Sequence, residues 1–246
     1  MRQLSGELLL TALDHGTEDT YLGRIITMLA IANPETSRGQ IIAQSLQEIT
    51  IQLLALRSLS FGPQLEGYLA CPSCNTRLEF TLPIDPVVER LRRSASLAKV
   101  YSTIGENSLT MRLATASDLL SISGITDLSE ARKELLARCL NEMQNTTLNL
   151  DTLSALENPE FHQLAVETFD RLQSDAEISI ELICPECGTS RSVDLDIGRF
   201  LWTEVRSAAM RLMRDVHDLA SAYGWQESAI LAMSDTRRRT YLEMIQ

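Results

Sequence analysis

The hydrophobic pattern divides the chain into helical stretches at both ends, with two strand-like stretches between them. Within residues 1–62, apolar residues recur every three or four positions, as in helices that pack on one side. The same spacing returns over residues 200–222, and two short helices are predicted after it. Strict alternation, which is typical of a half-buried strand, occurs over residues 78–82 and 178–182. The pattern predicts a mostly helical α+β protein with a small antiparallel sheet.

The segment between the two strand-like stretches forms a block of its own. Alternating apolar residues over 109–113 predict one strand, and two helices are predicted within 115–140. Residues 141–152 are polar and are predicted to form a loop, and Asn158 begins a further helix. The chain is thus predicted to consist of an N-terminal helical region (1–62), a first ribbon half (63–92), an inserted middle lobe of a strand plus helices (93–175), a second ribbon half (176–198) and a C-terminal helical region (199–246).

Each strand-like stretch contains a Cys-Pro-x-Cys turn, one at residues 71–74 and the other at 184–187. The apolar residues around the first turn recur at the same offset around the second. The matched pairs are Leu69 with Leu182, Leu82 with Leu195, and Ile84 with Ile197. The two stretches therefore look like copies of one unit, in which a strand, a turn, a second strand and the start of a helix follow one another.

Two such turns supply the four thiolates of a tetrahedral zinc site. We therefore expect Cys71, Cys74, Cys184 and Cys187 to bind one structural Zn²⁺, completing a zinc ribbon from two halves that are distant in sequence. The 109 residues between Cys74 and Cys184 do not forbid this, because the entropy of loop closure grows slowly with length. Four protein ligands leave the metal no open position, so a catalytic zinc is not expected.

The sequence also allows other roles for the four paired cysteines. Separate metal ions would need two more ligands at each turn, and the three histidines, His15, His162 and His217, are distant in sequence from both. A redox Cys-x-x-Cys motif usually stands between a strand and a helix, whereas strands are predicted on both sides here. Disulfides, or two turns that bind no metal, are also consistent with the sequence.

Composition and charge narrow the range of functions. The 246 residues carry a net charge of −11, which argues against binding a phosphate backbone as the main role. The sequence contains no phosphate-binding glycine loop, His-Glu-x-x-His motif or serine elbow, so no catalytic residue is predicted and the protein is expected not to be an enzyme. With neither a signal-peptide pattern nor an apolar stretch approaching the roughly 20 residues of a membrane span, we expect a cytoplasmic protein.

A series of short motifs from Cys184 onward resembles a family of small baseplate proteins. In order they are Cys184-Pro-x-Cys-Gly188, Phe200-Leu201-Trp202-x-Glu204, Val216-His217-x-Leu219-Ala220, Ala222-Tyr223-Gly224-Trp225 and Arg237-Arg238-x-x-Tyr241-Leu242. They are similar to those of the T4-type baseplate hub assembly chaperones, which are encoded beside contractile phage tails and phage-tail-like injection systems. The N-terminal helices and parts of the middle block resemble that family as well. One departure is Asn75, which stands where the second turn has Gly188, and Asn tolerates the left-handed conformation.

The resemblance implies a non-enzymatic assembly chaperone, or a minor structural component, of the baseplate or hub of a contractile injection system. It would bind baseplate or hub proteins, either in the cytoplasm or within the assembled particle. Aromatic and arginine side chains are frequent anchors at interfaces. As partner-binding residues we hypothesise Trp202, Tyr223, Trp225, Arg237, Arg238 and Tyr241. The competing interpretations are a packed helix corner at Trp225 and solvated arginines.

Two other functions are weighed against this one. Many zinc ribbons are associated with nucleic acid, but that role needs a basic face on an acidic protein. An enzyme with an unrecognised carboxylate site would show a deep polar pocket near the ribbon.

Overall fold

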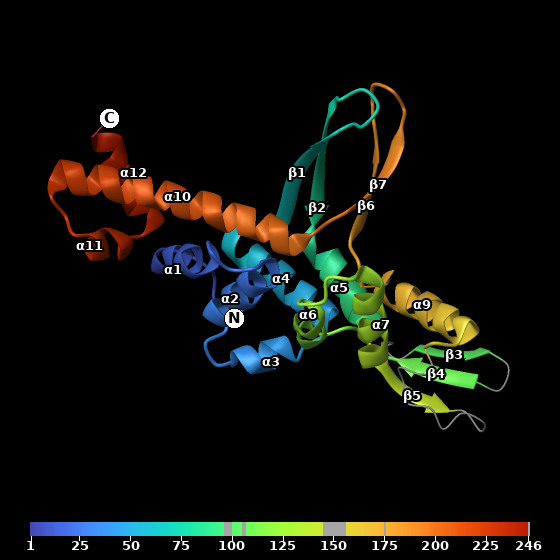
Figure 1. The fold of residues 1–246 in the computed structure, drawn as a ribbon. Coiled ribbons are helices and arrows are strands. Elements are labelled where there is room, and N and C mark those ends of the chain that lie inside the picture. The colour runs from blue at the N-terminus through green and yellow to red at the C-terminus, as the bar shows by residue number, and fades with distance from the viewer. Residues whose placement is uncertain (96–99, 105–106, 145–155, 175, 246) are drawn as a thin grey trace.

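The computed structural model describes residues 1–95, 100–104, 107–144, 156–174 and 176–245. Helices dominate, and the strands of the described residues form three small antiparallel sheets. Figure 1 shows two hairpins rising side by side from a helical body, with the long helix α10 extending to one side and the sheet β3–β5 lying on the other. The predicted mostly helical α+β class is confirmed.

The N-terminal part is helical, as the hydrophobic spacing predicted. Its elements are α1 (Glu7–Gly16), α2 (Tyr21–Ala32), α3 (Arg38–Ile42) and α4 (Leu46–Phe61). A capping box starts α4: the Glu48 backbone N–H donates to Ser45 Oγ, and the Ser45 backbone N–H donates to the Glu48 carboxylate at 2.9 Å. Gly62 follows with φ of 96°, a conformation that glycine adopts readily, and turns the chain into the first hairpin.

Each predicted ribbon half is an antiparallel hairpin followed by a helix. The elements are β1 (Gln64–Ala70), β2 (Arg77–Pro83) and α5 (Ile84–Ala95), then β6 (Ser179–Ile183), β7 (Ser190–Asp194) and α10 (Ile197–Tyr223). The two helices start at matched positions of the repeat, Ile84 and Ile197, and both side chains are buried. These residues anchor the base of each hairpin in the helical body. The hairpins form separate sheets and share no strand pairing within the described part of the chain.

The described residues of the middle block contain three strands where one was predicted. Its elements are β3 (Val100–Ile104), β4 (Asn107–Met111), α6 (Ala116–Ile122), α7 (Leu128–Cys139), β5 (Leu140–Gln144) and α9 (Pro159–Ser174). The loop predicted over 141–152 is wrong for residues 141–144, which pair with β4 as the edge strand β5. The backbone makes a strand ladder, so a polar segment can add to an existing edge without an apolar pattern. Residues 145–152 of that prediction lie outside the described residues.

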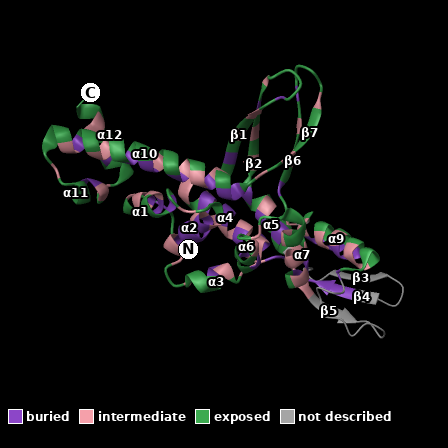
Figure 2. Cartoon of the chain, in the orientation of Figure 1, coloured by how far each residue is buried: buried purple, intermediate pink, exposed green. Residues whose placement is uncertain are grey.

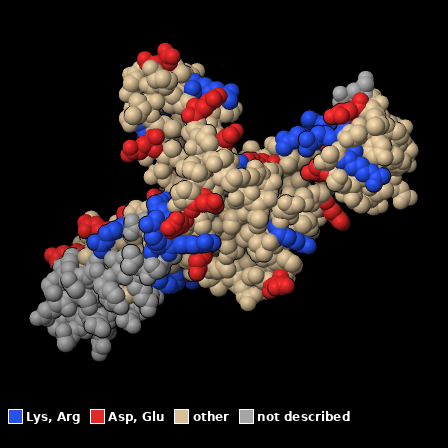
Figure 3. Space-filling model, turned by 180° about the vertical axis from the view of Figure 1, so that it is seen from behind, with Lys and Arg blue, Asp and Glu red and all other residues tan. Residues whose placement is uncertain are grey.

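The C-terminal helices form a lobe of their own. Helix α10 ends at Gly224, whose φ of 68° is the left-handed conformation that glycine adopts readily at a helix end. Helices α11 (Glu227–Leu231) and α12 (Asp235–Met244) fold back along α10. Figure 3, seen from behind, shows basic side chains gathered on this lobe. Among the described residues, none of the helices combines the length and the apolar character needed to cross a membrane.

Among the described residues, buried apolar side chains form two large clusters and one small one. The first joins α1, α2, α4 and α5 to the first turns of α10, and the second fills the middle block between α7, α9 and β4. The third lies between the hairpin tips. Figure 2 shows that burial is concentrated around α2, α4 and the base of α10, whereas the hairpins are largely exposed. The division of the chain into five parts stays a prediction.

Candidate metal centre

The two cysteine turns have the same backbone architecture. In the first, the Cys71 N–H donates to the Thr76 carbonyl at 2.8 Å, and in the second, the Cys184 N–H donates to the Thr189 carbonyl at 2.9 Å. Each bond closes the turn that joins the two strands, so the first cysteine of each pair lies at the tip of its hairpin. The repeat in the sequence is therefore also a repeat in three dimensions.

The residue after each cysteine pair adopts the left-handed conformation, with φ of 60° at Asn75 and 71° at Gly188. Its N–H donates to the carbonyl of Cys71 or Cys184 at 2.8 and 2.9 Å respectively. The expectation that Asn75 preserves the turn is confirmed. Asn is one of the few residues with a side chain that reaches this region at low cost.

The four sulfurs meet at the hairpin tips and pair crosswise. Cys71 Sγ lies 3.7 Å from Cys187 Sγ, and Cys74 Sγ lies 3.5 Å from Cys184 Sγ. All four sulfurs lie within 4.8 Å of one another. Sulfurs bound to zinc at the usual distance of about 2.3 Å form a tetrahedron with edges of about 3.8 Å. The cluster has the donor atoms and the size that a metal ion requires.

The arrangement differs from a set of disulfides. Both crosswise distances are well above the roughly 2.0 Å of a sulfur–sulfur bond, and all five cysteines are free. The fifth, Cys139, is buried in the middle block, where burial raises the pKa of its thiol to about 12. Cys139 is therefore a core residue of the middle block.

Threonines beside the exposed sulfurs favour the thiolate form. Thr189 Oγ1 lies 3.3 Å from Cys187 Sγ, and hydrogen bonding with the Thr189 side chain and backbone lowers the pKa of Cys187 to about 6. Thr76 is in the equivalent position at 3.3 Å from Cys74 Sγ and lowers the pKa of that thiol in the same way. Thiolates are the form in which cysteine binds metal, so both threonines suit a metal centre.

A small apolar cluster packs around two of the four cysteines. It contains the buried Leu78 with Cys71 and Cys184, and the half-buried Leu69 and Leu182 pack against it. Leu69 and Leu182 are the matched residues of the repeat, one from each hairpin. The hydroxyls of Thr189 and Ser73 add a contact at 3.3 Å. The contact between the two hairpin tips therefore consists of the four sulfurs, the leucines of this cluster and the two hydroxyls.

A buried ion pair that the sequence did not reveal fixes the base of the first hairpin. Arg57 of α4 and Glu204 of α10 lie 2.8 Å apart, and the Arg57 side chain is only 5% exposed. The Arg57 guanidinium also donates to the carbonyls of Gly62 and Gln64, where α4 gives way to β1. One side chain thus connects α4, the first hairpin and α10.

Three of the six residues hypothesised to bind a partner form one aromatic cluster. Tyr223 and Trp225 stack with ring centroids 4.5 Å apart, and the Tyr241 ring stands edge-on to Trp225 at 4.9 Å. The Arg237 guanidinium lies 5.7 Å from the centroid of Tyr241. The cluster joins the end of α10 to α12, and Tyr223 and Arg237 are exposed.

The other two hypothesised residues lie apart from this cluster. Trp202 packs between α1 and α2, where its ring meets Gly16 and lies 5.4 Å from the Arg24 guanidinium. Arg238 is buried and forms ion pairs with Asp215 at 3.2 Å and Asp235 at 2.6 Å. Trp202 and Arg238 therefore hold helices together within this chain.

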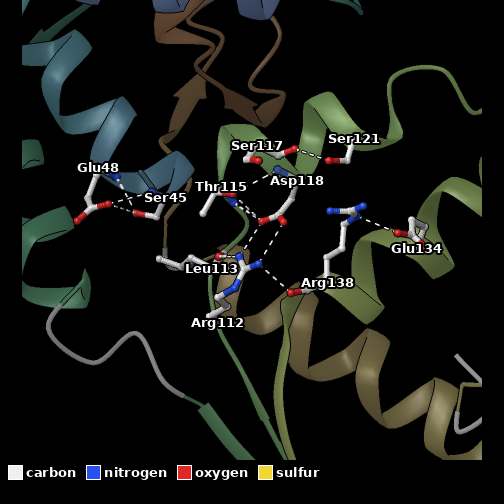
Figure 4. Close-up of polar contacts among 10 residues, drawn as sticks. All are labelled: Ser45, Glu48, Arg112, Leu113, Thr115, Ser117, Asp118, Ser121, Glu134 and Arg138. Atoms are coloured by element: carbon white, nitrogen blue, oxygen red, sulfur yellow. Dashed lines mark hydrogen bonds and ion pairs between the residues drawn. The ribbon is translucent and has the colours of Figure 1, made fainter. Parts of the chain in front are cut away.

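A second polar network joins the N-terminal helices to the middle block, and Figure 4 shows it. Asp118 accepts hydrogen bonds from the Arg112 guanidinium at 2.6 Å and from the Thr115 backbone N–H at 2.8 Å. Ser45, which begins α4, makes a bridge with Thr115, which begins α6. Two capping boxes therefore stand side by side. Each cap has a local motif in the sequence, Ser45-x-x-Glu48 or Thr115-x-x-Asp118, but no sequence pattern indicates that the two caps pair.

Comparison with known proteins places the chain in a family. A family model described as T4 bacteriophage base plate protein matches residues 6–202, a stretch that contains both cysteine turns and ends at Trp202. The motifs around Tyr223 and Arg237 lie beyond it. No curated protein and no solved structure matches the chain. Because the family match covers most of the 246 residues, the chain belongs to the T4 bacteriophage base plate protein family.

Proposed function

We propose that this protein is a non-enzymatic assembly chaperone, or a minor structural component, of the baseplate or hub of a contractile injection system. The observation that carries the proposal is the family match over residues 6–202. The protein acts by binding other baseplate or hub proteins, in the cytoplasm before assembly or within the assembled particle.

The four clustered cysteines are proposed to bind one structural Zn²⁺. Each hairpin supplies two ligands, and each hairpin runs directly into a helix, α5 or α10. A metal at the tips would cross-link the two hairpins and so limit the angle between α10 and the body. The support for this role is the closed set of four sulfurs, which leaves no position for a substrate.

The exposed part of the aromatic cluster is proposed as a partner contact. Tyr223 is 38% exposed although it stacks on Trp225, and Arg237 stands beside Tyr241. Rigid aromatic rings lose little conformational entropy on binding, and arginine forms paired hydrogen bonds with carboxylates, which makes both kinds of side chain effective anchors. Trp202 and Arg238, which pack inside the chain, act here by positioning α10 and α12.

Co-expression tests the proposed function. The tagged chain is co-expressed with each baseplate and hub protein encoded beside it, and purified complexes are weighed by native mass spectrometry. We expect a complex of defined stoichiometry with at least one of them. A chain that stays alone with all of them contradicts the proposal. Immunoblots of finished particles separate the two roles, because only a permanent component is retained.

A pair of substitutions tests the aromatic contact in the same assay. Tyr223→Ala should weaken the complex, whereas Tyr68→Ala, which removes an exposed tyrosine from the first hairpin, should leave it unchanged. Equal effects of the two substitutions would exclude the aromatic cluster as a partner contact. A nucleic-acid-binding role receives no support from the family match, and the net charge of −11 argues against it.

A further inference from the structure

A groove separates the C-terminal lobe from the N-terminal end of the chain. Its volume is about 440 Å³, and it runs between residues 3–9 and the end of α4 on one side and α10 and α12 on the other. Apolar side chains from both sides line it, including Phe61 of α4, Leu212 of α10 and Leu242 of α12. Apolar side chains of both helical layers therefore form part of the groove's lining, together with polar and charged ones.

Some of the charged side chains along this groove have ion-pair partners and others do not. Its two carboxylates, Asp215 and Asp235, are both paired with the buried Arg238. Arg211 of α10 and Arg239 of α12 also line the groove and are exposed. Within the described part of the chain, neither of these guanidiniums makes an ion pair or a side-chain hydrogen bond. The groove thus presents two unpaired positive charges beside its apolar lining.

This positive character contrasts with the rest of the protein. The last 50 residues contain seven of the 22 basic side chains but only six of the 33 acidic ones. Guanidinium groups bind carboxylates with paired hydrogen bonds, and they are less strongly hydrated than ammonium groups. A ligand that complements the groove therefore combines carboxylates with apolar side chains.

We propose that the groove binds an acidic amphipathic segment of a baseplate or hub protein. Carboxylates of the segment pair with Arg211 and Arg239, and its apolar side chains pack against Phe61, Leu212 and Leu242. The proposal rests on the proposed function, because it takes the partner to be a protein of the same assembly. It differs in location from the aromatic contact, since neither Tyr223 nor Trp225 lines the groove.

The first test uses a fluorescein-labelled helical peptide of glutamate and leucine, with lysine replacing glutamate in the control peptide, and a labelled oligothymidine as a third probe. Fluorescence anisotropy with the full chain should show binding of the glutamate peptide alone, weakened by added salt. Arg211→Glu with Arg239→Glu should weaken it at least tenfold. Arg206→Glu, an exposed arginine of α10 outside the groove, should not.

Equal loss with the groove variant and the Arg206→Glu control would overturn the proposal, as would equal binding of both peptides. Stronger binding of oligothymidine would favour nucleic acid instead. Sedimentation of the chain alone tests whether the groove binds a second copy of the same chain. Self-association that is lost in the groove variant would show that a second copy, and not a baseplate or hub protein, occupies the groove.

The co-expression complex tests the physiological partner. If wild type forms a complex and the Arg211→Glu, Arg239→Glu variant keeps it, the proposed function stands and the groove proposal fails. If wild type forms no complex with any tail protein, the proposed function itself fails. Circular dichroism and zinc content, unchanged in the variant, confirm that a loss of binding reflects the groove and not the fold.

Discussion

Cys74 Sγ lies 3.5 Å from Cys184 Sγ, although 110 positions separate the two residues in the sequence. Neither hairpin holds more than two of the four clustered sulfurs, and the hairpins share no strand pairing among the described residues. The large core around α2 and α4, in contrast, packs at the hairpin bases. If the four sulfurs bind a metal ion, as proposed, its loss should separate the hairpin tips before it unfolds the helical body.

The first prediction concerns a shared metal site. Cys71→Ser and Cys184→Ser should each abolish zinc binding, because a site with three thiolates from two separate hairpins binds metal far more weakly. Metal analysis of purified protein should give one zinc per wild-type chain and less than a tenth of that for each variant. Cys139→Ser, in the core of the middle block, should retain the metal. Metal loss confined to the variants of one turn would show that the turns bind separately.

The second prediction concerns the buried pair of Arg57 and Glu204. Arg57→Met should destabilise the protein by about 3–5 kcal/mol, because it leaves Glu204 without its partner in a largely buried position. Arg132→Ala breaks an exposed pair with Asp170 and should cost less than about 1 kcal/mol. Urea unfolding followed by circular dichroism measures both. Similar costs for the two substitutions would mean that the pair at Arg57 is not important for stability.

What the sequence could predict depends on how far apart the interacting residues lie. The paired turns were visible because the repeat itself marks equivalent positions, and it implied the start of a helix after each hairpin. The long helix predicted over residues 200–222 begins three residues earlier, at Ile197. The contact between Arg57 and Glu204 was not visible, because the residues are 147 positions apart. Glu204 belongs to the motif Phe200-Leu201-Trp202-x-Glu204, but that motif does not indicate which residue pairs with it.

Side-chain roles were harder to predict than elements. Trp202 and Tyr223 were both hypothesised to bind a partner because they are aromatic. In the structure, Trp202 packs against Gly16, whereas Tyr223 is exposed. Composition cannot separate these cases, since an aromatic ring is equally suited to a core and to an interface. Strand β5 was missed for a related reason, because a polar edge strand depends on its neighbour and not on its own pattern.

The third prediction is a pH dependence that arises from Asp118. Burial alone would raise the pKa of this carboxyl, but hydrogen bonds from Arg112 and Thr115 outweigh it and lower the pKa to about 2. An unfolded aspartate has a pKa of about 3.9. The ionised group therefore stabilises the fold fully above about pH 4, and this contribution is lost as the pH falls to about 2.

Asp118→Asn should accordingly lower the free energy of unfolding by about 2 kcal/mol at pH 7, and the difference from wild type should shrink toward zero near pH 2. Urea unfolding of both proteins between pH 7 and pH 2 measures this difference. Asp170→Asn, which changes an exposed carboxylate, is the matched control and should show little difference at any pH. A constant difference for Asp118→Asn across the range would contradict the argument.

The last prediction concerns the packing of Trp202 against α1. A Cβ atom at Gly16 would lie 2.5 Å from two atoms of the Trp202 ring, which is much closer than carbon atoms approach. The ring cannot swing away freely, because the Arg24 guanidinium lies over it and Arg24 Nε donates to the Gly16 carbonyl at 2.8 Å. Gly16→Ala should therefore cost about 1–3 kcal/mol, although alanine is the better helix former.

Two further variants make this prediction specific to the contact. Gly124→Ala places a methyl group in open space and should change stability by less than about 1 kcal/mol. In the Gly16→Ala background, Trp202→Leu should cost less than it does in wild type, because it removes the clash together with the ring. Thermal unfolding of the four proteins of this cycle measures the coupling. Additive effects would show that Gly16 is not needed for Trp202 to pack, and that α10 is held on α1 by other residues.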